Sequence, residues 1–178
     1  YALDANTTGS YNTAVGRHAL SSTTTANDNT AIGYDSLKVN TSGTANVALG
    51  VNSLVANTTG IQNTAIGKSA FDAITSGSYN TALGYNAGST ITTGASNIAI
   101  GRASLQNIST GSANVAIGQS ALANSSGDAS NNVAVGDNSL GANTTGASNV
   151  AVGYQALDAA TTADNNTAVG TLTLTSCT

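Results

Sequence analysis

The sequence contains no proline, methionine, tryptophan or glutamate, and only one histidine and one cysteine among its 178 residues. Aromatic residues make up 4% and charged residues 7%, both well below their usual share in globular domains. A chain with so few large side chains cannot build the thick core of an ordinary globule. Its composition also disfavours disorder, because disordered chains favour proline, lysine, glutamate and a high net charge, whereas this chain carries −4.

Reactive and charged side chains are too few to predict an enzyme. His18 is the only histidine and lies at a variable place, so neither a catalytic triad nor a histidine metal site is predicted. We therefore expect no enzyme activity, no cofactor, and no catalytic, cofactor-binding or metal-binding residues. An isolated calcium ion near Asp128 or Asp137 is the one metal alternative that the sequence leaves open.

The charge balance predicts no nucleic-acid partner, because eight acidic residues face only four basic ones. The basic residues are scattered along the sequence, which is typical of solvated surface: Arg17, Lys38, Lys68 and Arg102. No apolar run approaches the roughly 20 residues that cross a bilayer, so no membrane contact is expected in this segment. Cys177 is alone and fits either an incidental thiol or a bridge between chains.

What the sequence has in abundance is one short motif, asparagine, a small or β-branched residue, alanine, an aliphatic residue and glycine. The ten copies are Asn12–Gly16, Asn29–Gly33, Asn46–Gly50, Asn63–Gly67, Asn80–Gly84, Asn97–Gly101, Asn114–Gly118, Asn132–Gly136, Asn149–Gly153 and Asn166–Gly170. The step is 17 residues except between Asn114 and Asn132, where it is 18. A fixed short period of this kind predicts stacked repeats.

Numbered from its asparagine, the repeat begins with a predicted strand at positions 2 to 4, where β-branched residues alternate with alanine. Position 4 is always aliphatic, so we expect it to form a buried row in the core of each coil, with position 2 on the same face. Position 3 is alanine in all ten copies and faces the other way. That row predicts a second tight contact, between chains, although a compositional bias toward alanine would give the same pattern.

The remaining positions predict corners and a second apolar segment. Position 5 is always glycine, which suits a turn with positive φ. Positions 8 and 9, mostly alanine or serine followed by leucine, predict another short strand, and positions 13 to 15 predict a polar strand end closed by a second glycine corner. The asparagine at position 1 should form a ladder from coil to coil, with a row of ligand-binding amides as the alternative.

These features predict an all-β fold, a parallel β-solenoid with one coil of 17 residues per repeat and about ten coils. At the ordinary spacing between strands of about 4.8 Å, the stack would be a rod about 50 Å long. Residues 1–178 form one solenoid domain, and residues 171–178 read as a distorted last coil or the start of another module. Ala2 and Leu3 match Ala19 and Leu20, so we interpret the chain as a segment of a longer fibrous protein. The extra residue within 123–133 predicts a local bulge in a loop.

The motif resembles the head repeats of trimeric autotransporter adhesins, most closely at Asn97–Gly101 and Asn114–Gly118. It is also similar to repeats of phage tail-fibre proteins, as at Gly153–Leu157 and Thr58–Gly67. The resemblance implies a left-handed solenoid, three chains about one axis, and an extracellular, cell-surface or virion fibre that binds a host surface or a glycan receptor. It favours a structural or adhesive fibre segment, a homotrimer, acting in attachment or as a shaft.

Two other functions fit the same repeats. The first is an extracellular filament in which single chains stack end to end through open coils. The second, suggested by the threonine rows, is an ice-binding solenoid, although adjacent threonines point to opposite faces and leave one outward file. Five tyrosines lie beside the asparagine or directly after the first glycine, where exposed rings suit either sugar and protein contacts or plain surface: Tyr11, Tyr34, Tyr79, Tyr85 and Tyr154.

Overall fold

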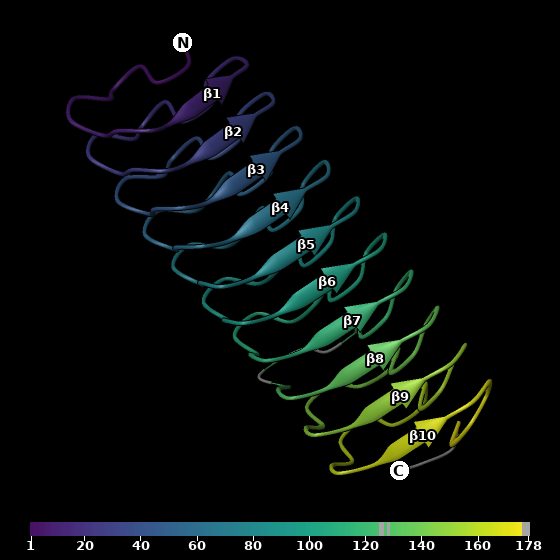
Figure 1. Cartoon of the computed structure of the whole chain (residues 1–178). Coiled ribbons are helices and arrows are strands. Elements are labelled where there is room, and N and C mark those ends of the chain that lie inside the picture. The colour runs from purple at the N-terminus through teal and green to yellow at the C-terminus, as the bar shows by residue number, and fades with distance from the viewer. Residues whose placement is uncertain (125–126, 128, 176–178) are drawn as a thin grey trace.

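Ten parallel strands of three residues each stack in chain order into one sheet (Figure 1). The computed structural model describes residues 1–124, 127 and 129–175, and no helix occurs among them. The strands are β1 (Thr13–Val15), β2 (Thr30–Ile32), β3 (Val47–Leu49), β4 (Thr64–Ile66), β5 (Thr81–Leu83), β6 (Ile98–Ile100), β7 (Val115–Ile117), β8 (Val133–Val135), β9 (Val150–Val152) and β10 (Thr167–Val169). The predicted all-β parallel solenoid, with one coil per repeat, is confirmed.

Every strand pairs in register with its neighbours, so each repeat position forms a row along the rod. Ala14 pairs with Ala31, for example, and Ala116 pairs with Ala134 across the one 18-residue step. The extra residue is therefore absorbed outside the sheet, as predicted for the bulge within 123–133, of which residues 125, 126 and 128 lie outside the described part.

The second strand predicted at positions 8 and 9 does not form. These residues are turns, and the leucine adopts a left-handed backbone conformation, as at Leu20 with φ 51°. Coils are still hydrogen-bonded there, because the Leu20 amide donates to the Ser36 carbonyl at 3.1 Å. The predicted polar strand end is also a bend, where the Thr41 amide and hydroxyl both donate to the Thr58 carbonyl at 3.0 Å. Each coil thus has one strand, and turns stacked in register complete it.

The two faces of the strands are the reverse of the prediction. The alanines of position 3 point into the coil and are fully buried at Ala31 to Ala151, while positions 2 and 4 point outward. The expected buried row at position 4 is wrong: Leu49 is 41% exposed and Leu83 is 46% exposed. The expected contact between chains at the alanine row is wrong for the same reason, because those side chains already line the core of their own coil.

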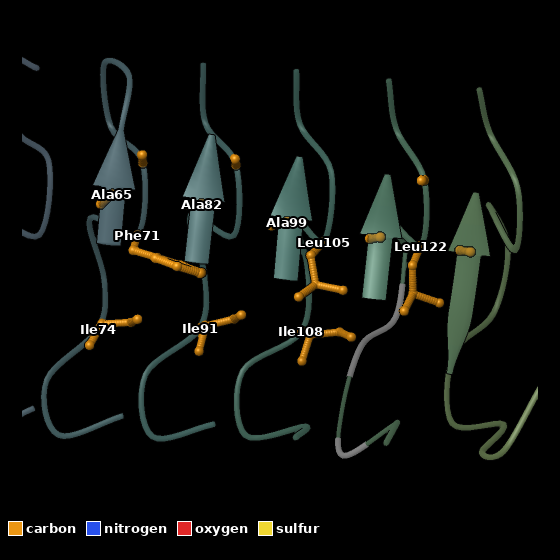
Figure 2. Packing of buried hydrophobic residues seen from close by; sticks show 14 of the residues in the cluster. Ala65, Phe71, Ile74, Ala82, Ile91, Ala99, Leu105, Ile108 and Leu122 are labelled. Carbon is orange, nitrogen blue, oxygen red and sulfur yellow. The ribbon is translucent and has the colours of Figure 1, made fainter. Parts of the chain in front are cut away.

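The core explains why only alanine fits on the inner face of the strands. Leucine side chains from position 9 enter the same interior from the turn side and are fully buried, as Leu105 and Leu122 are (Figure 2). Position 12 adds a further buried row, which includes Ile74, Ile91 and Ile108. The large side chains opposite the strand fill the interior of this narrow coil, and the strand therefore contributes only a methyl group.

The glycine of position 5 meets two separate constraints. Gly33 has a φ of 142°, which confirms the predicted turn with positive φ. A β-carbon at Gly33 would also lie 2.3 Å from the carbonyl oxygen of Gly50 in the next coil. At the second corner, a β-carbon at Gly43 would lie 2.3 Å from the carbonyl oxygen of Gly60, although Ala26 and Ala163 occupy the same position in other coils, so this corner demands glycine less strictly.

Candidate functional surfaces

The asparagines of position 1 form a continuous ladder through the rod. The Oδ1 atom of Asn63 accepts from the backbone amide of Asn80 at 3.0 Å and from its Nδ2 atom at 3.1 Å. The same Nδ2 atom donates to the Gly94 carbonyl at 2.9 Å, which ties the two corners of one coil together. From Asn29 to Asn149 these side chains are fully buried. The predicted ladder is confirmed, and its amides are occupied by structural bonds.

A second, incomplete asparagine row lies at position 12, which the sequence analysis missed. Asn57 donates from Nδ2 to Asn40 Oδ1 at 3.0 Å and to the Gly60 carbonyl at 3.1 Å. Its own Oδ1 atom is buried without a hydrogen-bond partner, because Ile74 follows at this position in the next coil. The sequence signal for this row is that position 12 is asparagine in some repeats and isoleucine in others. The row therefore accepts either side chain.

A long apolar feature of the surface is the outward sheet face, defined as positions 2 and 4 of all ten coils, whose side chains are exposed or partly exposed. Position 4 contributes ten aliphatic side chains, and position 2 contributes five aliphatic residues and five threonines. None of these twenty side chains is charged or carries an amide. Nine steps of about 4.8 Å make the face about 43 Å long. An unbroken aliphatic row beside a row of aliphatic residues and threonines is unusual on an isolated soluble chain and is typical of contact surfaces.

A cluster of charged side chains lies on the first two coils, outside the sheet. Asp35 accepts a bond from Lys38 Nζ at 2.9 Å, and its other carboxylate oxygen is 2.9 Å from His18 Nδ1. Burial of Asp35 opposes its ionisation, but the hydrogen bonds from Lys38 and His18 outweigh burial and hold the pKa of the carboxyl below its ordinary value. The cluster therefore holds the Asp35 carboxylate between His18 and Lys38 on the surface of the solenoid.

A second carboxyl group shifts in the opposite direction. Asp72 is partly buried, and this burial raises its pKa, although hydrogen bonds to the carboxyl, including one from Ser69, act against the rise. Neither carboxyl lies beside a second acidic group that would form a paired acid and base. The arrangement suggests local structure rather than proton transfer.

The tyrosines singled out by the sequence are all exposed and fall into two rows. Tyr11 and Tyr79 precede the asparagine, whereas Tyr34, Tyr85 and Tyr154 follow the first glycine. The basic side chains are less scattered than the sequence suggested. Two of them contact tyrosines of the neighbouring coil, as the further inference below develops.

The part of the chain that the structure describes encloses no pocket and holds no group of three or more histidine, cysteine, aspartate or glutamate residues that could bind a metal ion. Of the two aspartates considered for an isolated calcium ion, Asp137 is exposed and Asp128 lies outside the described residues, as does Cys177. No helix among the described residues has the length and apolarity needed to span a membrane. The candidate functional features are therefore surfaces rather than cavities.

Comparison with protein-family models, curated proteins and solved structures finds no match to this chain.

Proposed function

We propose that this chain is a structural and adhesive fibre segment of an extracellular appendage or a virion fibre, and that three copies associate side by side through the outward sheet face. The observation that carries the proposal is the unbroken aliphatic row at position 4 of the outward sheet face, along a rod whose coils are hydrogen-bonded to one another. Location outside the cell and the number three come from the motif resemblance, whereas the choice of surface comes from exposure.

The outward sheet face suits another copy of the chain because the two surfaces have the same length and the same repeat. Burial of exposed aliphatic surface stabilises an interface by about 25 cal/mol per Å². Sheets that pack face to face lie about 10 Å apart, which matches side chains of the size of valine, isoleucine and leucine. Ten identical coils in register would present complementary rows to each neighbour over the full rod. The fibre would thereby gain stiffness without needing large cores in its single chains.

The proposal is tested by the mass of the purified chain in solution, measured by light scattering after gel filtration and by chemical cross-linking. We expect a trimer for the natural chain. The double variant Leu49→Gln and Leu83→Gln should shift the population toward monomer, because it places polar side chains within the contact. The matched control is Val51→Gln, which changes an exposed aliphatic residue outside the outward sheet face and should leave the trimer unchanged.

A chain that remains monomeric at high concentration would contradict lateral association. A dimer that the same double variant dissociates would support the surface and contradict the threefold number. The alternative of an end-to-end filament predicts indefinite fibres in electron micrographs, whereas lateral association alone predicts bounded rods. We expect no enzyme activity from this segment.

A further inference from the structure

The residue directly after the first glycine forms a second exposed line along the rod, which we call the position-6 row. Its ten members are Arg17, Tyr34, Val51, Lys68, Tyr85, Arg102, Gln119, Asp137, Tyr154 and Thr171. Every one of them is exposed. Backbone hydrogen bonds fix the spacing of the row. The residue after each row member donates its amide to the carbonyl oxygen of the row member in the preceding coil, as Asp35 does to Arg17 and Ser120 does to Arg102, both at 3.0 Å.

The first six members carry most of the positive charge of an acidic protein. Three of its four basic residues lie here, Arg17, Lys68 and Arg102, and no acidic residue interrupts the row between them. At about 4.8 Å per coil, Arg17 and Lys68 are separated by about 14 Å along the axis and Lys68 and Arg102 by about 10 Å. These three basic residues, which are far apart in the sequence, are thus brought into one line by the 17-residue period.

Two of these cations are paired with tyrosines of the following coil. The Arg17 guanidinium carbon lies 5.9 Å from the centre of the Tyr34 ring, and Lys68 Nζ lies 6.0 Å from the centre of the Tyr85 ring. Cation–aromatic contacts of this kind hold charge and ring together at a solvent-exposed surface. The result is the same unit, a cation followed by an aromatic ring, repeated three coils apart on one line.

We propose that the position-6 row from Arg17 to Arg102 binds an extended acidic polysaccharide that lies parallel to the rod. Its carboxylate or sulfate groups would meet the three cations. Its sugar rings would stack on Tyr34 and Tyr85, which are 44% and 49% exposed. The ligand is a linear polymer because the site is a line, with no pocket to enclose a small molecule in the described residues.

The spacing of charge favours a polysaccharide over a nucleic acid. A nucleic-acid strand carries one phosphate about every 3.4 Å, and a protein with a net charge of −4 and three cations in line would neutralise only a few of them. A polysaccharide with one acidic group per repeating unit carries its charges farther apart, closer to the spacing of the cations. It also offers rings without charge between them, where the row presents tyrosines.

This inference rests on the adhesive part of the proposed function and is independent of lateral association. Position 6 does not belong to the outward sheet face, so the variants that test binding differ from those that test assembly. A chain that assembles but binds no polysaccharide would leave the fibre proposal standing. A chain that binds but remains monomeric would contradict the trimer alone.

The test measures binding of the full chain to immobilised hyaluronan and unsulfated chondroitin, which carry one carboxylate per disaccharide, with neutral dextran and single-stranded poly(dT) as comparison probes. We expect hyaluronan or chondroitin to bind, with an affinity that falls as salt rises, and dextran and poly(dT) to bind at least roughly tenfold more weakly. The triple variant Arg17→Gln, Lys68→Gln and Arg102→Gln should lose roughly tenfold or more in affinity. The double variant Tyr34→Ala and Tyr85→Ala should lose several-fold while keeping the same salt dependence.

Two controls use residues of the same types outside the row. Lys38→Gln removes the fourth basic residue and Tyr79→Ala removes an exposed tyrosine, and both should retain the natural affinity within about twofold. The proposal is overturned if the natural chain binds neither acidic polysaccharide, if poly(dT) binds as tightly as they do, or if the triple variant binds as well as Lys38→Gln. Circular dichroism of each variant shows that its solenoid remains folded.

Discussion

The two faces of the same ten strands differ in a way that inverts the usual pattern of a sheet. The inner face carries asparagine and alanine, whereas the outward sheet face carries valine, isoleucine, leucine and threonine. The inner polar groups are stable there because the ladder satisfies them from coil to coil, as Asn80 is by Asn63. The outer aliphatic groups remain exposed or only partly buried. On these strands, the space inside the coil rather than hydrophobicity therefore decides which side chains are buried.

The difference between the faces is tested most strongly by adding the same bulk to each. Ala82→Leu together with Ala99→Leu forces two larger side chains into fully buried sites and should destabilise the fold by about 2–6 kcal/mol, since overpacking costs about 1–3 kcal/mol per site. Denaturant unfolding at a concentration where the chains are dissociated measures this loss. The matched control, Thr64→Leu together with Thr81→Leu, adds two leucines on the outward sheet face and should change stability by less than about 1 kcal/mol.

Equal stability of the inner and outer leucine variants would contradict the assignment of the two faces. That assignment is also where the sequence was least informative. The period, the parallel stacking, the glycine turn and the asparagine ladder could all be predicted, because each follows from identical residues repeated at a fixed step. Which face of the strand points into the coil could not be predicted, because position 4 is aliphatic in every repeat and hydrophobicity alone places it inside.

The missed turns have a related physical cause. Leucine at position 9 adopts positive φ throughout the described coils, a conformation that leucine rarely takes and that no local sequence signal marks. It is stabilised by the fully buried leucine row and by the hydrogen bonds between coils at the same place. Likewise, the alignment of Arg17, Lys68 and Arg102 follows from the period. The sequence does not show that all three side chains are exposed, which a binding surface requires.

The polar half of the inner face is tested by removing one rung of the ladder. Asn80→Ala removes bonds to Asn63 and Gly94 and leaves the Asn97 amide without its acceptor. We expect a loss of about 2–4 kcal/mol, because each buried group left unsatisfied costs about 1–3 kcal/mol. Thermal and denaturant unfolding both measure the change.

The matched control for this rung is Asn107→Ala, which truncates an exposed asparagine of the coil that follows. It should alter stability by no more than about 0.5 kcal/mol. If Asn80→Ala changed stability as little as this control does, the hydrogen bonds of the ladder would contribute little to stability and would not explain why asparagine is buried.

The apolar half of the inner face contains a natural exchange of volume between two coils. Phe71 and Gly88 replace the leucines of position 9, and a β-carbon at Gly88 would lie 2.2 Å from Cε1 of Phe71. The Phe71 ring thus occupies the space that a leucine would fill in the next coil, and it points toward the coil of β5 (Figure 2). Gly88 has a φ of 62°, close to that of the leucines in this row, so its backbone can accept leucine.

We expect Phe71→Leu and Gly88→Leu to destabilise the chain singly, by leaving a cavity and by a clash, at about 1–3 kcal/mol each. The double variant should recover most of this loss, because it restores the uninterrupted leucine row. A double-mutant cycle measures the coupling, which should be favourable and larger than half the sum of the two single losses. Additive effects of the two substitutions would mean that the two residues do not share one space.

The smallest expected effect concerns the ion-paired carboxyl of Asp35, which lies outside the sheet. The asparagine ladder on the inner face, by contrast, contains no titratable group. The Asp35 carboxyl, with its pKa held below the ordinary value by Lys38 and His18, contributes stability above that ordinary value and loses it as pH falls through the lower pKa of the folded state. Asp35→Asn should remove this contribution, which is below about 1 kcal/mol since its partners are partly exposed. The natural chain should thus be the more stable one at neutral pH, and the difference between the two should shrink as pH falls below the ordinary pKa of an aspartate carboxyl.

The charge-matched control for this comparison is Asp28→Asn, an exposed carboxyl that makes no ion pair within the described chain. At neutral pH it should match the natural chain in stability to within about 0.5 kcal/mol. Asp72, whose burial raises its pKa, acts in the opposite direction but is present in all three proteins and cancels from their differences. A difference between Asp35→Asn and the natural chain that stays constant on acidification would mean that packing, rather than charge, holds this corner of the outer wall.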